Sequence, residues 1–367
     1  MDKIKIIALV AVVVVVVAAF AVVFTTIGDD NDSDGSRTVV DFNGREVVIK
    51  SADRILSTSA VPTSILCGLG VSSKIVAVSS DPDVYGEDPH IIGATDDDFP
   101  KAIVDGMANG SIKALGGMYN MSAETIASVA SDVVICDAYG IKQETMDALD
   151  QLGITYIVVS GTGLMGEIYD TIELLGKVVG KESVANRMIS EMKSSIKKIQ
   201  DWCKSVVENK MGGKKYNVAM MMTARYAIGP NYLGGEIMGQ LHVNNVFSNI
   251  DRYALVTSES IAEANPDAII FQNLGMGDGV TNPAAYIVSV YSDPILGGIS
   301  ASGNGLIFAT TEGAKNAASY ANQGIVRAYA MYAMFIYQDY LSFDVPDILN
   351  SSNYSQCIEQ FWSEINS

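Results

Sequence analysis

A short pattern occurs twice in this chain of 367 residues, at a constant offset of 135 residues. In each copy the sequence Glu-x-Ile-Ala is followed, after four intervening residues, by Asp-x-x-Ile, and the copies begin at Glu124 and Glu259. A hydroxyl residue, Ser122 or Thr257, lies two positions before each copy, and its side-chain oxygen is suited to cap a helix. Each copy therefore predicts a short capped helix, a turn and a buried apolar strand.

The wide spacing of the two copies predicts two similar α/β lobes. It argues against a solenoid, because solenoid repeats have a far shorter period. Two unrelated helix–strand units that share a local pattern remain the alternative. Two lobes would also create a cleft between them, and small ligands often bind in such clefts.

The amino-acid composition and the absence of two catalytic motifs exclude several classes of function. Hydrophobic residues make up 49% of the chain, which is enough to bury the cores of two domains. The formal net charge of −18 argues against a nucleic-acid partner, because nucleic-acid binding needs a basic surface. The sequence has no Gly-x-Ser-x-Gly elbow and no glycine-rich phosphate loop before Lys-Ser/Thr, so we expect no enzyme.

Metal ligands are also scarce. The two histidines cannot form a three-histidine site, and the four cysteines form no Cys-x-x-Cys pair. We therefore expect neither a metal site nor a cofactor. Buried free thiols and disulfides both remain open for the cysteines, which are Cys67, Cys136, Cys203 and Cys357.

The N-terminal region predicts a membrane segment. Residues 6–28 carry no charge, and as a helix they would span about 34 Å, enough for the core of a bilayer. Two lysines precede this run and several aspartates follow it, which places the body of the protein outside the cytoplasm. A cleaved signal peptide is the alternative. We assign residues 1–28 to the anchor or signal and residues 29–37 to a flexible linker.

Strand and helix signals alternate through the rest of the chain, which indicates largely parallel sheets. Residues 38–163 form the predicted first lobe, and a hairpin around Asn43-Gly44 opens it. Residues 212–367 form the predicted second lobe with a returning C-terminal helix. Within it, residues 314–340 are expected to form one long helix.

A long helix is predicted between the lobes. Apolar residues recur at steps of three or four from residue 183 to residue 209, and a helix of that length measures about 40 Å. Such a helix is suited to connect two lobes as a stiff strut. We assign residues 164–211 to this interlobe region.

Several segments, together with both copies of the repeated pattern, occur in a characteristic order. They are Arg54–Ser57, Ile65–Gly70, Lys74–Val78, Gly235–Val246, Asp293–Leu296 and Asn304–Ile307. In this order they resemble the substrate-binding proteins of ABC transporters for iron siderophores and cobalamin, the class III type with a helical backbone. The resemblance extends over roughly residues 38–363.

The resemblance implies two Rossmann-like lobes joined by one long rigid helix, with the ligand between them. Together with the N-terminal run, we expect an extracytoplasmic, monomeric body that is held at the cell membrane by the N-terminal helix. Its partners would be an ABC permease and ATPase, and its ligand an iron chelate, haem or corrinoid. An anchored sensor ectodomain and an extracellular enzyme on a two-lobed scaffold remain alternatives.

Docking to the permease follows from the same resemblance. Family members often carry a glutamate near the start of the first-lobe helix, where it meets permease arginines. Ser64 occupies that position in this chain. Glu236 is therefore the candidate docking residue, on the second lobe.

The candidate ligand-binding residues follow from a general rule for open α/β sheets, in which ligands bind beyond the carboxyl ends of the strands. Tyrosine recurs at the predicted strand ends, and its flat face and polar tip suit a bulky organic ligand better than a bare divalent ion. Arginine there can pair with carboxylates or an anionic chelate. Packing tyrosines and surface ion pairs remain the alternative. The candidates are Ser59, Tyr85, Tyr119, Tyr139, Arg225, Tyr226, Arg252, Tyr253, Gln272 and Asn273.

Overall fold

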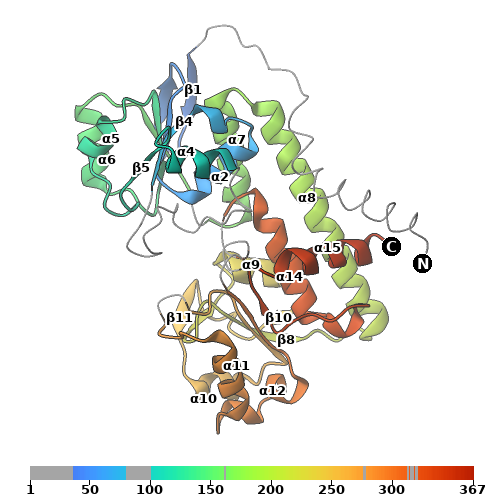
Figure 1. Ribbon diagram of the computed structural model, residues 1–367. Coiled ribbons are helices and arrows are strands. Elements are labelled where there is room, and N and C mark those ends of the chain that lie inside the picture. The colour runs from blue at the N-terminus through green and yellow to red at the C-terminus, as the bar shows by residue number, and fades with distance from the viewer. Residues whose placement is uncertain are drawn as a thin grey trace. The chain divides into compact units, whose positions relative to one another are not determined.

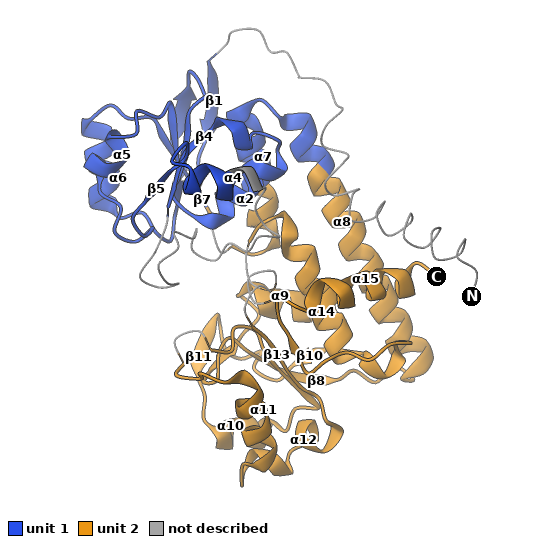
Figure 2. Ribbon diagram, viewed as in Figure 1, with its two compact units in different colours: residues 1–92, 99–159, 171–187 blue, residues 93–98, 160–170, 188–367 orange. Residues whose placement is uncertain are grey.

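The computed structural model describes most of the chain (Figure 1). The described residues are 36–79, 101–160, 163–275, 278–311, 314, 318 and 321–367. They fall into two compact units, which Figure 2 colours separately. Among the described residues, the first unit comprises 36–79, 101–159 and 171–187, and the second comprises 160, 163–170 and those from 188 onward.

The predicted membrane segment, residues 1–28, lies outside the described residues, as does the linker up to residue 35. Within the described part of the chain, no helix has both the length and the apolar composition needed to cross a membrane. The N-terminal anchor therefore stays a prediction.

The first unit is built on a five-stranded parallel sheet in the order β5-β4-β3-β6-β7. Helices cover both faces, with α5 and α6 on one face and α2, α4 and α7 (Met165–Val179) on the other (Figure 1). The strands are β3 Ile55–Ser57, β4 Ile75–Ser79, β5 Lys113–Leu115, β6 Val133–Asp137 and β7 Tyr156–Val159. The helices are α2 Ala60–Gly68, η2 Ser72–Lys74, α4 Lys101–Ala108, α5 Ala123–Ala127 and α6 Gln143–Gln151. All residues of β3, β6 and β7 are buried, as a sheet covered on both faces requires.

An antiparallel hairpin precedes this sheet. Its strands are β1 Arg37–Val40 and β2 Glu46–Ile49, and Gly44 in the turn has a φ of 75°. Glycine adopts this left-handed backbone without steric cost. The hairpin that Asn43-Gly44 predicted is confirmed.

The second unit contains a seven-stranded sheet in the order β11-β9-β8-β12-β13-β14, with β10 also paired to β8. Strands β9 and β11 are antiparallel to their neighbours, and the other pairings are parallel. The strands are β8 Asn217–Met221, β9 Tyr226–Ile228, β10 Asn244–Asn245, β11 Tyr253–Leu255, β12 Ala268–Phe271, β13 Ile307–Thr310 and β14 Ile348–Leu349. The helices are α9 Leu233–Gln240, α10 Ser258–Ala264, α11 Pro283–Ser292, η4 Leu296–Gly298, α12 Ser300–Asn304, η5 Gln323–Ile325, α14 Val326–Ile336, η6 Gln338–Tyr340 and α15 Tyr354–Ile365. The expectation of an α/β fold with largely parallel sheets is thus confirmed.

Two helices have residues in both units. Helix α7, Met165–Val179, and helix α8, Glu182–Ser205, are separated by a turn at Gly180, where φ is 68°. Helix α8 contains 24 residues and continues as a π-helical turn, η3 Val206–Lys210. The predicted long helix is therefore present, and the assignment of residues 164–211 to an interlobe region stays a prediction.

The prediction of one helix from residue 314 to residue 340 is wrong. Ala314 and Ala318 are helical, but the backbone at Asn322 is extended, with φ −131° and ψ −175°. The Asn322 side chain accepts a hydrogen bond from the N–H of Gly324 at 2.7 Å, so it caps a new helical segment. Asparagine competes with the helical backbone in this way, which is why it favours caps over helix interiors.

The repeated pattern has the same local structure in both units. Ser122 Oγ accepts a hydrogen bond from the N–H of Thr125, and Thr257 Oγ1 accepts one from the N–H of Ser260, each at 3.2 Å. The turn after each short helix contains a residue with positive φ, 53° at Ala130 and 40° at Asn265. The predicted caps, helices and strands are confirmed in both copies.

The aspartate of each copy binds the start of the neighbouring strand. Asp132 Oδ2 accepts from the N–H of Arg54 at 3.0 Å, and its own N–H donates to Arg54 O at 2.8 Å. Asp267 repeats the arrangement with Asn217, at 2.8 Å and 2.7 Å. These aspartate clamps, Asp132 with Arg54 and Asp267 with Asn217, align β6 with β3 and β12 with β8. The repeat is therefore a structural element of the fold.

Replacing Asp267 by alanine should lower the free energy of unfolding by about 1–3 kcal/mol, because the N–H of Asn217 loses a charged acceptor. Asp267→Asn keeps an acceptor oxygen and should cost less. Urea denaturation of both variants measures the difference. An Asp267→Ala variant as stable as the unsubstituted chain would contradict the role of the clamp.

Candidate functional site

Buried polar side chains gather at the carboxyl edge of the first sheet, where β3 and β6 end. Asp137, the last residue of β6, is only 2% exposed. Its carboxylate accepts hydrogen bonds from Ser59 Oγ at 2.7 Å and from the N–H of Tyr139 at 2.8 Å. Burial raises the pKa of Asp137, while these two hydrogen bonds act in the opposite direction.

Ser59 is positioned by the same network. It is the residue that precedes α2, and its carbonyl oxygen accepts from Thr63 Oγ1 at 2.7 Å. Because its hydroxyl proton is donated to Asp137, its oxygen can only accept from a further partner. Contact between Ser59 and a ligand stays a prediction.

Two predicted tyrosines lie close to this carboxylate. Tyr119 and Tyr139 are 55% and 52% exposed. The pKa of Tyr119 is raised, first by desolvation and then by the negative charge of Asp137. The first unit thus presents two accessible phenol rings beside a buried carboxylate. Tyr85, a further candidate, lies outside the described residues.

The raised pKa of Asp137 predicts a pH-dependent term in stability. Between the pKa of an unfolded aspartate, 3.8, and the higher folded-state value, the folded chain holds a proton that the unfolded chain has lost. This stabilisation is fully present below the unfolded pKa and disappears as the pH rises through the folded pKa. The melting temperature of Asp137→Asn relative to the unsubstituted chain should therefore increase from acidic to neutral pH. Calorimetry of both proteins tests this, and a difference that does not vary with pH would contradict it.

The carboxyl edge of the second sheet carries buried amide side chains. Gln272 and Asn273 follow β12 and are 0% and 4% exposed. Gln272 Nε2 donates to Ala318 O at 2.9 Å, and Thr310 Oγ1 donates to the Gln272 backbone oxygen. Within the described part of the chain, Gln272 Oε1 and Asn273 Oδ1 have no hydrogen-bond partner. Buried acceptors normally find donors, so these two oxygens are available to one.

Three tyrosines pack together at the antiparallel side of the same sheet. The ring of Tyr253 lies edge-on to Tyr226, with centroids 6.0 Å apart, and edge-on to Tyr232, with centroids 5.8 Å apart. Tyr226 and Tyr253 remain 36% and 49% exposed. We call these three residues the tyrosine cluster. Tyr226 and Tyr253, which were expected at the ends of strands, are instead the first residues of β9 and β11. Tyr232 was not predicted because it lies four residues after β9 and directly before helix α9.

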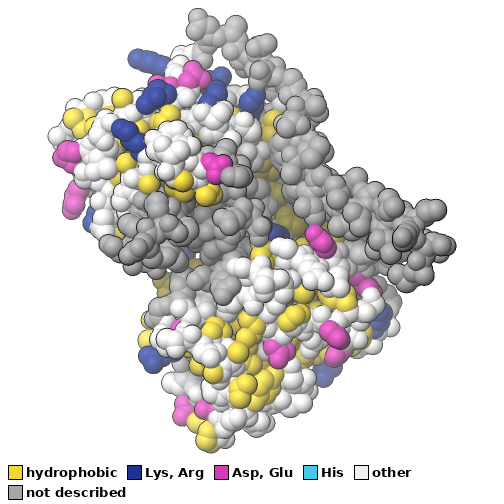
Figure 3. Space-filling view, viewed as in Figure 1, with side chains coloured by type: hydrophobic (Ala, Val, Ile, Leu, Met, Phe, Trp, Pro, Cys, Tyr) yellow, Lys and Arg dark blue, Asp and Glu magenta, His cyan; other side chains and the backbone are white. Residues whose placement is uncertain are grey.

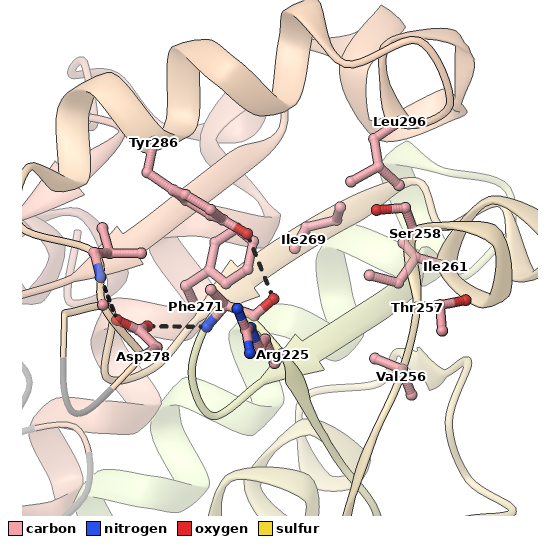
Figure 4. Close-up of a pocket in the computed structure, with 13 residues that line it drawn as sticks. Arg225, Val256, Thr257, Ser258, Ile261, Ile269, Phe271, Asp278, Tyr286 and Leu296 are labelled. Atoms are coloured by element: carbon pink, nitrogen blue, oxygen red, sulfur yellow. Dashed lines mark hydrogen bonds between the residues drawn. The ribbon is translucent and has the colours of Figure 1, made fainter.

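The two candidate arginines are both exposed. Arg252 directly precedes Tyr253 of the tyrosine cluster. Arg225 lines a cavity of about 390 Å³ in the second unit, with Ile269 and Phe271 among its apolar residues (Figure 4). Asp278 Oδ2 accepts from the N–H of Ala224 at 3.1 Å and fixes the loop that carries Arg225.

Glu236, the predicted docking residue, takes part in an internal network. Its Oε2 accepts from the N–H of Met165, the first residue of α7, at 2.8 Å. Its Oε1 accepts from Gln240 Nε2 at 3.2 Å, and Gln240 Oε1 accepts from Tyr329 OH at 2.7 Å. A carboxylate at a helix N-terminus is favourable, because unpaired N–H groups point toward it. Permease docking through Glu236 stays a prediction.

The described residues offer no candidate metal site. They contain no group of three or more histidine, cysteine, aspartate or glutamate side chains that could hold a metal ion. All four cysteines are free thiols, and burial raises the pKa of Cys67 to about 12.

On the visible faces of both units, charged groups of both signs are interspersed with apolar patches (Figure 3).

Comparison with known proteins identifies the family. Residues 55–312 match the family described as periplasmic binding proteins. The chain is a member of the periplasmic binding protein family. Membership confirms the resemblance seen in the sequence and the expectation of a binding protein that is not an enzyme.

One relative and two solved structures are informative for this periplasmic binding protein. The uncharacterized ABC transporter substrate-binding lipoprotein YvrC of Bacillus subtilis (strain 168) is 26% identical over 237 residues, which cover 64% of this chain and 68% of YvrC. A structure solved as a possible iron-binding (periplasmic solute-binding) protein of Staphylococcus epidermidis ATCC 12228 has a TM-score of 0.59 at 22% identity and covers 78% of this chain and 98% of its own. A periplasmic heme binding protein of Pseudomonas aeruginosa has a TM-score of 0.60 at 15% identity, and the match covers 78% of this chain and 93% of the other. The two solved structures share the fold.

Proposed function

We propose that this chain is the extracytoplasmic substrate-binding component of an ABC importer, and that it delivers an iron siderophore, haem or a corrinoid to a permease. The observation that carries the proposal is the family match over residues 55–312. YvrC is described as an ABC transporter substrate-binding lipoprotein. Relatives with this fold include a possible iron-binding protein and a heme-binding protein, which supports this class of ligand.

The side chains of the second unit suit a bulky organic ligand. The tyrosine cluster offers exposed ring faces, on which a flat or lobed chelate can rest. Gln272 Oε1 and Asn273 Oδ1 can accept from hydroxyl or amide groups of the ligand. Arg225 and Arg252 can pair with its carboxylates.

The first unit offers a different set of contacts. Tyr119 and Tyr139 present exposed rings, and Asp137 holds the backbone of Tyr139 in place. Ser59 can only accept from a ligand, because its proton is donated to Asp137. This edge therefore favours hydrogen-bond donors over carboxylates.

The ligand class can be tested directly. Absorption and mass spectra of the protein from its native host should reveal a bound chelate, haem or corrinoid. Titration with haemin, a ferric trihydroxamate and cobalamin should then give at least micromolar affinity for one of them, about −8 kcal/mol. Failure to bind any of the three would contradict the proposed ligand class.

Replacing Tyr253 or Arg225 by alanine should each weaken binding of that ligand by about 1–3 kcal/mol, or about 5-fold to about 150-fold in Kd. The loss follows from removal of a ring face in one case and a cationic donor in the other. Val288→Ala on α11 is the matched control, because Val288 is 63% exposed and lies outside the candidate site. Unchanged affinity in both variants would show that the site lies elsewhere, while the family-level function would stand.

The N-terminal run, residues 6–28, is the proposed membrane anchor. Full-length protein should stay in the membrane fraction, with residues 38–367 accessible to protease from outside, because an uncharged run of this length spans a bilayer. Deletion of residues 1–36 should give a soluble monomer. Full-length expression that yields only soluble protein starting near residue 22 would indicate a cleaved signal peptide instead.

Docking to the permease through Glu236 belongs to the same proposal. Its carboxylate already accepts from Met165 and Gln240, so an arginine of the permease would share a carboxylate that is held in a fixed orientation. A fixed carboxylate loses little side-chain entropy on docking, which favours recognition.

A further inference from the structure

The outer face of the β1–β2 hairpin and the turn that joins its strands expose apolar side chains. Val40, Phe42 and Val48 are 57%, 50% and 49% exposed, whereas Val39 and Ile49 on the opposite face are 4% and 1% exposed. In the register of the hairpin, Thr38 pairs with Val48 and Val40 with Glu46. Val40 and Val48 are therefore diagonal neighbours on one face. We call Val40, Phe42 and Val48 the hairpin patch.

The tip of the hairpin is held rigidly. The buried carboxylate of Asp41 accepts from the N–H of Arg45 and from its Nε and Nη2, each at 3.0 Å. The Arg45 guanidinium lies over the ring of Tyr156, 3.9 Å from its centroid. The N–H of Phe42 donates to Val158 O at 2.9 Å, at the end of β7. Phe42 is thus exposed although its backbone is fixed in place.

The hairpin lies close in the sequence to the proposed membrane anchor. Strand β1 begins at Arg37, the last residue of the predicted linker 29–37, so eight residues, 29–36, separate it from the uncharged run of residues 6–28. A flexible chain of eight residues has a root-mean-square length of about 14–17 Å. If the uncharged run spans a bilayer, as proposed above, the hairpin patch stays within roughly that distance of the membrane surface.

We propose that the hairpin patch is a membrane-contact surface, and that its three side chains enter the boundary between lipid headgroups and acyl chains. This proposal rests on the proposed N-terminal anchor. Apolar side chains gain free energy from burial in that boundary, and the fixed tip avoids an ordering cost for Phe42. Glu46 lies on the same face, so the contact uses apolar burial and does not need anionic lipid.

A lipid-quenching experiment tests the contact. The full chain carrying Phe42→Trp is reconstituted in phosphatidylcholine vesicles, with and without brominated acyl chains, and tryptophan emission is compared. The unsubstituted chain gives the background emission, which comes from Trp202 and Trp362. The emission added by Phe42→Trp should shift to shorter wavelength and be largely quenched by the brominated lipid. Val288→Trp, at the 63% exposed position on α11, is the matched control and should add unquenched emission.

A second variant tests whether Val40 and Val48 contribute to the membrane contact together with residue 42. Adding Val40→Ser and Val48→Ser to Phe42→Trp should reduce the quenching, and the thermal unfolding curve of each protein verifies folding. Emission from Phe42→Trp that is quenched no more than that from Val288→Trp would overturn the proposal. A shift to shorter wavelength without quenching by lipid would also overturn it, because a second copy or another protein would then cover the patch.

The two proposals fail in distinguishable ways. Full-length chain that does not float with the vesicles on a density gradient would overturn the proposed anchor, and the membrane contact with it. Chain that floats while its Phe42→Trp emission is unquenched would overturn the membrane contact alone.

Discussion

The central strand pair of each unit is held at its start by one aspartate. Asp132 exchanges hydrogen bonds with the backbone of Arg54, and Asp267 does so with the backbone of Asn217. These contacts align strands that are far apart in the sequence, and a parallel pair that is aligned at its start is also aligned at its carboxyl end. The candidate site residues that follow those strands depend on this alignment.

The two carboxyl edges that result differ in chemistry. The first unit has a buried carboxylate, Asp137, whose oxygens accept hydrogen bonds from Ser59 and Tyr139, and two exposed tyrosines lie beside it. At the carboxyl edge of the second sheet, the buried amide oxygens of Gln272 and Asn273 have no partners in the described residues, and the tyrosine cluster lies at the antiparallel side of that sheet. Both units therefore expose tyrosine rings, whereas the buried polar groups are a carboxylate in the first unit and amide oxygens in the second.

Local structure was largely predictable from the sequence. The Asn43-Gly44 hairpin, the caps at Ser122 and Thr257 and the strand of residues 156–159 follow from interactions between residues close together in the chain. The expected helix over residues 314–340 was wrong because its apolar composition concealed a cap at Asn322. Composition describes burial, but it does not show where a side chain competes with the helical backbone.

The sequence by itself determined the α/β class and the two-unit repeat, because periodicity, caps and turns are encoded by neighbouring residues. The family followed from the resemblance of several ordered segments to known substrate-binding proteins. Only the tertiary structure decided which side chains meet. Ser59 reaches Asp137 across 78 positions, and Glu236 reaches the N–H of Met165 across 71. Tyr232 joins the tyrosine cluster for the same reason, since its ring is brought to Tyr253 by the packing of α9 against the sheet. Such contacts depend on strand order and helix packing, which no local pattern specifies.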